Sequence, residues 1–376
     1  MKIGIITIQK SEVNFGACLQ SFALWRFISS LGYDCEVIDL LRPCHASYKI
    51  SKKFGERQKP FKERFKRFPK SVICYLLGVF SKSNSLKKFH LFNNKIRYSK
   101  EYRSVEQLYN DKVDYDILVS GSDQIWNPQM PFVNEPYFLT FAPKGCKRIA
   151  YASSFGIDSI DKAVSDRYRL WLGEYDSLST REDSGATIIN GLIDREVPVV
   201  LDPVFLLAAD DWRQEMASYK RLQYGAYVLL YMLKFNEKVL NHAIAISKEK
   251  HLPLYFVLSE NRVIKTEEAS QIIDIGPAEW MWLIDNANTM ITSSFHGTAF
   301  STIFNTPFIV FLKKGSPTNT RIEGLASKLD LSGHIYYEDD EIDYSSIDSS
   351  FKQESGIVLK KERGKSIDYI YSALVK

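Results

Sequence analysis

Short apolar runs alternate with helix-like stretches along the chain. The first apolar run covers 2–8, a helix-like stretch opens near Asn14, and a second apolar run covers 35–40. This strand, helix, strand order predicts a parallel βαβ unit, in which the helix N-terminus lies at the carboxyl edge of the sheet. Apolar runs at 115–120 and 148–152 predict two further strands of this sheet.

The alternation continues into a second series of elements. The pattern predicts strands at 177–182 and 197–203, separated by a short helical stretch at 184–188, and then a fresh set of strands at 226–231, 254–258, 289–292 and 307–311. We therefore expect an α/β protein with two Rossmann-like domains facing a central cleft. The expected division is an N-terminal domain at 1–209, a linker at 210–225, a C-terminal domain at 226–345, and a tail ending in a helix at 346–376.

Composition narrows the class of protein. The 376 residues are 45% hydrophobic and 25% charged, which is typical of a globular chain long enough for two domains. The N-terminal apolar run is too short for a signal peptide, and 72–80 falls far short of the roughly 20 residues that span a bilayer. The five cysteines are scattered and have no C-x-x-C spacing. We expect a cytoplasmic protein without a disulfide framework, bound metal or resident cofactor.

A net charge of +4 hides a strongly basic segment. Residues 49–100 hold 16 Lys or Arg and only 2 Glu, so this segment carries 16 − 2 = +14 and the rest of the chain −10. We interpret it as a basic helical insertion at about 45–110 in the N-terminal domain. Such a segment could meet nucleic acid, an anionic membrane or a phosphorylated carrier. Interleaved aromatic residues favour peripheral contact with an anionic membrane over a disordered basic tail, and simple packing against the domain is the alternative. We expect no nucleic-acid partner.

The strongest candidate site lies where the strand at 289–292 meets a helix expected at 298–305. Backbone N–H groups at a helix start bind anions, and hydroxyl groups add donors. His296 can move a proton near neutral pH, so we assign it general acid or base work, with a helix-capping histidine as the alternative. The residues expected to bind phosphate here are Ser293, Ser294, Gly297 and Thr298.

Basic side chains at other strand ends could complete this anion site. Arg181 follows a predicted strand and offers a planar guanidinium suited to a carboxylate or phosphate, although a surface ion pair with Glu182 is the alternative. Lys313 and Arg321 follow the strand at 307–311 and could clamp the same anion, unless they belong to a solvated loop. Polar groups and a tryptophan at 121–128 suit a sugar, with an Asx-turn as the alternative.

Nucleotide and hydrolase motifs are absent from the sequence. Neither G-x-x-x-x-G-K-[ST] nor G-x-G-x-x-G occurs, and H-E-x-x-H and G-x-S-x-G are missing as well. Their absence weakens assignments to ATPases, dehydrogenases, zinc proteases and α/β-hydrolases.

Several short motifs together resemble the polysaccharide pyruvyl transferase family. They are Asn14-Phe15-Gly16-Ala17-Cys18-Leu19-Gln20, Gly121-Ser122-Asp123-Gln124-Ile125-Trp126-Asn127-Pro128, Arg181-Glu182, Leu201-Asp202-Pro203 and Ser293-Ser294-Phe295-His296-Gly297. The resemblance runs from residue 1 to about Leu331. It implies a fold like that of GT-B glycosyltransferases and transfer of pyruvate from phosphoenolpyruvate, a co-substrate, to two sugar hydroxyls as a cyclic ketal. The implied acceptor is a cell-surface or capsular polysaccharide precursor, expected on a polyprenyl diphosphate at the inner membrane face.

The resemblance also suggests roles for individual residues. His296 would handle protons, Arg181 would hold the donor, and Asp123 would join them as a catalytic group. Many family members carry an arginine two residues before this histidine, where this chain has Ser294, so phosphate recognition would shift to Arg181, Arg321 or Lys313. The residues expected to bind the acceptor are Asn14, Gly16, Gln20, Gly121, Ser122, Gln124, Trp126 and Asn127.

Two other functions fit the same pattern. Paired Rossmann-like domains with a phosphate-binding helix start would also serve a GT-B glycosyltransferase that uses a nucleotide-sugar donor. The basic segment and Ser294 would suit a non-catalytic protein that binds a glycan or a lipid carrier.

Overall fold

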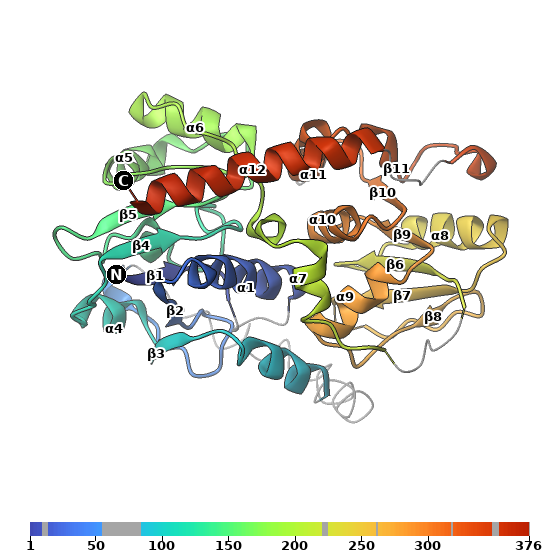
Figure 1. Ribbon diagram of the computed structural model, residues 1–376, viewed down its shortest axis with the longest axis horizontal. Coiled ribbons are helices and arrows are strands. Elements are labelled where there is room, and N and C mark those ends of the chain that lie inside the picture. The colour runs from blue at the N-terminus through green and yellow to red at the C-terminus, as the bar shows by residue number, and fades with distance from the viewer. Residues whose placement is uncertain are drawn as a thin grey trace.

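The computed structural model describes residues 1–9, 14–54, 84–219, 225–260, 262–316, 319–347 and 353–375. Two β-sheets lie side by side, each with helices against it (Figure 1). We call residues 1–219, which carry the first sheet, the N-terminal half, and 225–347, which carry the second, the C-terminal half.

The first sheet has five strands in the order β3-β2-β1-β4-β5, all paired in parallel. The strands are β1 (Lys2–Ile6), β2 (Asp34–Leu40), β3 (Tyr98–Tyr102), β4 (Ile117–Ser120) and β5 (Lys147–Ala150). The helices of this half are α1 (Phe15–Ser30), α4 (Val105–Asn110), α5 (Lys162–Gly173), α6 (Asp183–Ile193) and α7 (Ala209–Arg213), with 3-10 turns η1 (Lys52–Phe54), η2 (Glu135–Phe138) and η3 (Pro203–Leu206).

The second sheet has six parallel strands in the order β11-β10-β9-β6-β7-β8. They are β6 (Val228–Met232), β7 (Leu254–Leu258), β8 (Ser270–Gln271), β9 (Thr289–Thr292), β10 (Phe308–Leu312) and β11 (Ile335–Tyr337). The helices are α8 (Glu237–Glu249), α9 (Pro277–Asp285), α10 (Phe295–Phe304) and α11 (Thr320–Lys328), with 3-10 turns η5 (Ser332–His334) and η6 (Tyr344–Ser346). The expected fold class, two Rossmann-like domains of α/β type, is confirmed.

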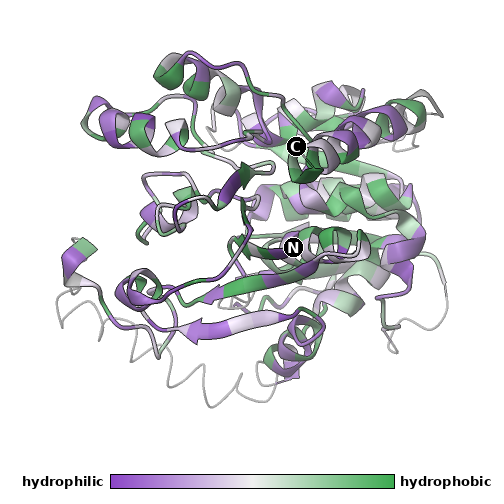
Figure 2. Ribbon diagram, turned by 60° about the vertical axis from the view of Figure 1, so that its left-hand side comes forward, coloured by the Kyte–Doolittle hydropathy of each residue, from purple (hydrophilic) through white to green (hydrophobic). Residues whose placement is uncertain are grey.

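The central strands are apolar because helices cover both faces of each sheet. Every residue of β4, β6, β9 and β10 is buried, as expected for parallel strands in the middle of an α/β layer. The helices on the outside of the molecule, by contrast, mix hydrophobic and hydrophilic residues (Figure 2). This difference explains why the inner strands were predictable from short apolar runs.

Each sheet reverses its strand order once, and this reversal decides where a ligand site can form. The reversal lies between β1 and β4 in the first sheet and between β6 and β9 in the second. Such a switch point opens a crevice at the carboxyl ends of the strands. Side chains close both crevices near the backbone: Thr7 Oγ1 donates to the Ser122 carbonyl at 2.9 Å, and Thr292 Oγ1 donates to the Tyr231 carbonyl at 2.9 Å.

The C-terminal helix α12 (Gln353–Val375) ties the two halves together. It runs across both, and the C-terminus lies on the same side of the molecule as the N-terminus (Figure 1). Near its start, Ser355 Oγ donates to the carbonyl of Asp330 at 3.0 Å, and farther along the Tyr369 hydroxyl donates to the carbonyl of Ala150 at 2.8 Å. The tail expected after 346 thus packs back onto the N-terminal half.

Aromatic side chains fill much of the junction between the halves. Phe15 of α1 stacks on Trp280 of α9 with ring centroids 5.2 Å apart, and Tyr231 of β6 lies edge-on to the same indole at 5.1 Å. Phe89, from helical residues 84–93, adds a contact to Phe15 at 5.1 Å. All four rings are buried. The two halves therefore share one continuous hydrophobic core.

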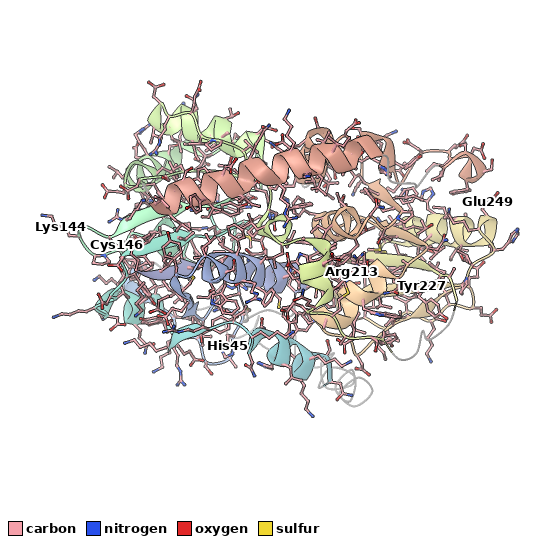
Figure 3. The ribbon with its side chains drawn as sticks, in the orientation of Figure 1. His45, Lys144, Cys146, Arg213, Tyr227 and Glu249 are labelled. Atoms are coloured by element: carbon pink, nitrogen blue, oxygen red, sulfur yellow. The ribbon has the colours of Figure 1, made fainter. Side chains whose placement is uncertain are left out.

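Several predicted elements differ from the structure. The segments expected as strands at 177–182 and 197–203 form only isolated bridges, such as that between Thr180 and Val199, because they run at the edge of the first sheet beyond β5. Residues 210–213, expected in a linker, belong to α7, where Arg213 pairs with Asp285 of α9 through both carboxylate oxygens (Figure 3).

The basic segment is only partly helical. Residues 55–83 lie outside the described part of the chain, and this includes most of the predicted amphipathic face. Helical residues 84–93 dock on the C-terminal half, where Lys88 Nζ donates to the Asp274 carbonyl and pairs with Glu279. Beyond them the chain forms β3, which pairs with β2, so the expected helical insertion ends before this strand.

Candidate active site

Two helix N-termini meet at the junction between the halves. α1 follows β1 and begins at Phe15, and α10 follows β9 and begins at Phe295. They approach so closely that a Cβ atom added to Gly16 would lie 2.1 Å from Nδ1 of His296. Only a residue without a side chain fits there. The structure therefore places Gly16 and His296, predicted from different halves, side by side.

In the turn that leads into α10, several hydrogen-bonding groups bond to one another. The helix begins at Phe295 rather than at the expected Thr298, because Ser294 acts as the N-cap and its Oγ accepts the Gly297 N–H at 3.4 Å. The Ser294 carbonyl in turn accepts the hydroxyl of Thr298 at 3.1 Å. Ser294, Gly297 and Thr298 thus bond to one another instead of forming the expected open phosphate cradle.

Two backbone donors at this turn have no partner within the helix. The first N–H groups of a helix have no partner within it, and here they belong to Phe295 and His296. The half-buried Ser293 lies just before them. An anion next to these groups would also benefit from the positive end of the α10 dipole.

Arg181 lies at the centre of a buried ionic cluster. Its side chain is only 2% exposed, and its Nη1 donates to Oδ2 of Asp202 at 2.8 Å. Nη2 lies 3.9 Å from Oδ1 of Asp123, and Nε lies 3.6 Å from Oε2 of Glu182. The guanidinium also covers the ring of Phe295 at 4.7 Å. The alternative of a surface pair with Glu182 is therefore wrong, because both side chains are buried.

The carboxylates around Arg181 are themselves anchored. Oε1 of Glu182 accepts bonds from the Ser154 hydroxyl at 2.7 Å and from the N–H groups of Phe155 and Gly156 at 3.0 and 3.2 Å. Burial lowers the pKa of Arg181, but the charges of these carboxylates outweigh burial and hold the pKa above its usual value. Arg181 is therefore a fixed positive charge. Its Nε and Nη2 atoms still have no hydrogen-bond partner.

A second arginine reaches the cluster from the C-terminal half. Arg321 of α11 lies 2.9 and 3.1 Å through its two terminal nitrogens from the Gln124 side-chain amide, which accepts both bonds when its oxygen is turned towards the arginine. Burial and the neighbouring charge of Arg181 lower the pKa of Arg321. Two guanidinium groups thus face one site, and an anion between them would relieve their repulsion.

Asp123 lies at a sharp turn of the backbone next to the same ionic cluster. Its backbone is left-handed, with φ 71°, and its Oδ1 accepts the Gln124 N–H at 2.9 Å. Burial raises the pKa of Asp123, yet the charges of Arg181, His296 and Arg321 prevail and lower it below the usual value. The structure therefore brings Asp123 together with the other residues predicted to be catalytic.

His296 is half-buried among these charges, and its buried Nε2 atom has no hydrogen-bond partner. This nitrogen lies 3.9 Å from Oδ2 of Asp202, too far for a hydrogen bond. Burial is the largest influence and lowers the pKa of His296, while Asp202 and Asp123 oppose it. The imidazole is therefore neutral near pH 7 and able to accept a proton.

A pocket opens beside the cluster, between α6 of the N-terminal half and α11 of the C-terminal half. It encloses about 320 Å³ when its open mouth is included. Both arginines line it, and so does the ring of Phe295. Its lining residues are Arg181, Glu182, Asp183, Val199, Leu201, Asp202, Phe295, Arg321, Gly324, Leu325 and Lys328.

Some residues predicted to bind a sugar acceptor support the fold instead. Trp126 is fully buried, stacks on Phe138, and donates its indole N–H to the Tyr137 carbonyl at 3.1 Å. Gln20 is equally buried, and its amide donates to the carbonyls of Ile8 and Ala17. Neither side chain is placed to contact a sugar, so these two assignments do not fit the structure.

The other predicted acceptor residues fall into two groups. Gly121 is buried where a Cβ atom would lie 2.8 Å from Thr7, and Asn14 caps α1 by accepting the Ala17 N–H at 3.2 Å. Asn127 accepts the Gln129 N–H at 2.9 Å, which is the Asx-turn weighed as an alternative. Ser122 and Gln124, by contrast, bond to Asp202 and Arg321 and so belong to the site.

Lys313 is the predicted anion-binding residue that lies elsewhere. Its side chain is exposed, and its charge acts on Asp339 rather than on the arginine cluster. β10 ends at Leu312, and the chain then turns away from the junction before α11 brings Arg321 back. The predicted clamp therefore reduces to Arg181 and Arg321.

Sequence reasoning gave no role to Asp202, the residue that connects the cluster. It lies in the Leu201-Asp202-Pro203 motif, at the carboxyl end of a segment with an apolar pattern. A carboxylate at such a position, followed by proline, was the available signal. Lys328, which lines the pocket and donates to the Val199 carbonyl at 3.2 Å, had no comparable signal.

Two features are absent from the described residues: a group of side chains that could hold a metal ion, and a helix that could cross a membrane. No group of three or more His, Cys, Asp or Glu side chains in the described ranges is arranged to hold a metal ion. In the same part of the chain, no helix combines the length and apolar character needed to cross a membrane.

The fold and the site together define a GT-B-like protein with a polar site at the switch points of both sheets. The chain belongs to the polysaccharide pyruvyl transferase family, whose model matches residues 14–312. It is accordingly a transferase of polysaccharide biosynthesis. No curated protein matches the sequence.

Solved structures of sugar-nucleotide enzymes share this fold. UDP-GlcNAc 2-epimerase of Methanocaldococcus jannaschii, in complex with UDP-GlcNAc and UDP, aligns with a TM-score of 0.51 and 13% identity over 100% of this chain and 99% of its own. The enzyme from Neisseria meningitidis, bound to UDP-GlcNAc, aligns with a TM-score of 0.52 and 9% identity over 100% of both chains. UGT89C1 of Arabidopsis thaliana, complexed with quercetin, gives 0.50 and 10% over 99% and 97%. At such identities the likeness concerns the fold alone.

Proposed function

We propose that this protein transfers pyruvate from phosphoenolpyruvate to two hydroxyls of a sugar in a cell-surface or capsular polysaccharide precursor. The observation that carries the proposal is the convergence of two guanidinium groups on one small pocket, with the neutral imidazole of His296 3.9 Å from Asp202, which lines the same pocket. Phosphoenolpyruvate bears a phosphate and a carboxylate, which are the anions that arginine side chains bind best. Membership of the pyruvyl transferase family supports the same donor.

The chemistry needs a proton shuttle and anion donors. His296 is neutral in the free site and becomes protonated once the bound donor anions offset the charges of Arg181 and Arg321. Its imidazolium then passes a proton to the methylene carbon of the donor, which becomes a methyl group and leaves C2 cationic. One sugar hydroxyl adds to C2 and returns its proton to the imidazole. The second hydroxyl then replaces phosphate at C2, closes the ketal ring and releases its proton with the leaving phosphate. Arg181 and Arg321 would hold the donor anions throughout.

Crowding at the junction favours a small donor over a nucleotide sugar. The rings of Phe15, Trp280 and Tyr231 are packed against one another between the carboxyl ends of β1 and β6. A base, ribose and diphosphate would need this packing to open farther than a donor the size of phosphoenolpyruvate would. Thermal shift measurements with phosphoenolpyruvate and with UDP-GlcNAc separate the two, and stabilisation by UDP-GlcNAc alone would exclude the proposal.

The direct test is release of phosphate from phosphoenolpyruvate in the presence of a competent acceptor. His296→Ala should abolish turnover, and phosphate release at the unmutated rate would contradict the proton-transfer role. Arg181 requires a milder change, because its removal takes the counter-charge from the buried carboxylates of Glu182 and Asp202. Arg181→Lys keeps the charge but loses the planar fork, so we expect weaker donor binding in a folded protein.

We also propose that the acceptor is linked to a polyprenyl diphosphate at the inner membrane face and that the basic segment contacts anionic lipid there. The described part of this segment already places Lys95 beside Glu215, so that lysine is paired within the protein. The prediction concerns Lys62, Arg64, Lys66 and Arg67, which lie outside the described residues. Neutralising these four should weaken binding to anionic liposomes, and unchanged binding would refute the membrane contact.

A further inference from the structure

We propose that Asp202 is the positioning residue of this site: its fixed carboxylate aligns Arg181 towards the donor and stabilises the protonated imidazole of His296. The inference rests on the proposed function for its effect on turnover. Its effect on His296 can be tested without donor or acceptor.

Asp202 is held by hydrogen bonds to both of its carboxylate oxygens. Its side chain is fully buried, and Oδ1 accepts the Val204 N–H at 3.1 Å at the start of η3. Oδ2 accepts the Ser122 hydroxyl at 2.9 Å and Nη1 of Arg181 at 2.8 Å. These contacts anchor it to the turn that follows β4, to η3 and to the segment that follows Ser179. The carboxylate cannot rotate away, so its charge stays at one point.

That point faces the imidazole across the junction. His296 Nε2 lies 3.9 Å from Oδ2 of Asp202 and has no hydrogen-bond partner, so this nitrogen is free to take up a proton. A positive charge formed there would lie next to a buried negative one, where Coulomb attraction is stronger than in water. The Nδ1 edge of the ring rests against Gly16, which fixes the ring relative to α1.

The remaining charges around His296 do not cancel this effect. Asp123 also favours the imidazolium, whereas Arg181 and Arg321 oppose it. Burial is the largest influence and disfavours the charged ring. A donor anion bound to the two arginines offsets their unfavourable effect on the imidazolium. Asp202 then stabilises the protonated His296 that the transfer step requires.

Glu182 provides a matched control within the same cluster. It is also a buried carboxylate beside Arg181, with Oε2 3.6 Å from Nε, but its Oε1 faces Ser154 and the 155–156 backbone. It is not among the groups with the largest effect on the pKa of His296, whereas Asp202 is the charge that raises this pKa most. Asp202→Asn and Glu182→Gln therefore remove similar charges from Arg181, but only the first removes the main favourable charge beside His296.

The experiment follows the His296 ring by NMR during a pH titration, with the signal assigned by its loss in His296→Gln. Asp202→Asn should lower the pKa of His296, and Glu182→Gln should leave it near the wild-type value. In the pH profile of turnover, the basic limb of Asp202→Asn should lie at lower pH than that of the wild type. The loss at pH 7.5 is about tenfold for each unit by which the imidazole pKa falls.

A second variant tests the proposal if Asp202→Asn does not fold. Asp202→Glu keeps the charge and the counter-ion of Arg181 but shifts the carboxylate by one methylene, so kcat should fall at least about tenfold while the His296 pKa stays at or above the wild-type value. Equal pKa shifts in the Asp202 and Glu182 variants, or full activity of Asp202→Glu, would overturn the proposal. A selective pKa shift without any phosphoenolpyruvate turnover would instead count against the proposed function alone.

Discussion

Gly16→Ala offers the sharpest test of the junction, because the added methyl group meets the imidazole of His296 directly. The new Cβ atom would lie 2.1 Å from Nδ1, 2.5 Å from Cε1 and 2.6 Å from Cγ. Ordinary contact begins at 3.4 Å, so the ring or α1 must move by 3.4 − 2.1 = 1.3 Å. A displacement of about 1 Å at a reacting group can cost on the order of 100-fold in rate.

The fold should tolerate this change better than the chemistry does. Gly16 lies in the first turn of α1, and alanine is favoured over glycine in helices by about 0.5–1 kcal/mol, which partly offsets the clash. We therefore expect a folded protein whose kcat falls by about 100-fold, equivalent to about 2.7 kcal/mol of activation free energy. Phosphate release measures kcat, and thermal melting measures stability.

Gly191→Ala is the matched control for this experiment. Gly191 lies in α6, and nothing would lie within 4 Å of its new Cβ atom, so activity should stay unchanged and stability should rise slightly. Turnover of Gly16→Ala within twofold of the wild type would refute the reasoning, because it would mean that the position of His296 does not matter for the reaction.

Three further predictions concern the surroundings of the same site. Arg321→Gln removes the guanidinium that faces Arg181, and we expect KM for phosphoenolpyruvate to rise about tenfold or more with an unchanged melting temperature; an unchanged KM would exclude Arg321 from donor binding. Trp126→Phe removes a buried indole and its bond to Tyr137, so the free energy of unfolding should fall by about 1–3 kcal/mol without a change in acceptor KM, and a selective loss of acceptor binding would restore its predicted sugar contact. Burial lowers the pKa of His296 in the folded protein, so below about pH 6.5 the unfolded chain binds a proton that the folded chain refuses, and stability falls as the pH drops. Denaturant titrations at several pH values should show a smaller fall for His296→Gln, and equal slopes would contradict this account.

Local patterns were sufficient for the frame of the molecule. The strands β7 (Leu254–Leu258) and β9 (Thr289–Thr292) match the predicted ranges residue for residue, because a strand buried on both faces is a bounded apolar run. Edge strands lacked this signal: β3 (Tyr98–Tyr102) carries Ser99, Lys100 and Glu101 and was interpreted as part of a helical insertion. Its position is set by pairing with β2, which no local pattern records.

The candidate site divides in the same way. His296 and Arg181 were found from the sequence because each follows a strand and carries a side chain with distinct chemistry. Trp126 was misplaced because a tryptophan beside polar residues looks the same in sequence whether it faces solvent or stacks on Phe138. Burial depends on neighbours from other elements, and it decided between these two outcomes.

The sequence by itself thus determined two α/β halves with parallel sheets and a histidine at the start of one helix. It also placed family motifs in both halves. Only the tertiary structure decided that Gly16 touches His296, that Arg321 rather than Lys313 joins Arg181, and that Asp202 links them. The physical reason is range: hydrophobic periodicity and helix capping act between residues close in the chain. The charges of the site act across a junction that forms only when aromatic packing joins the two halves.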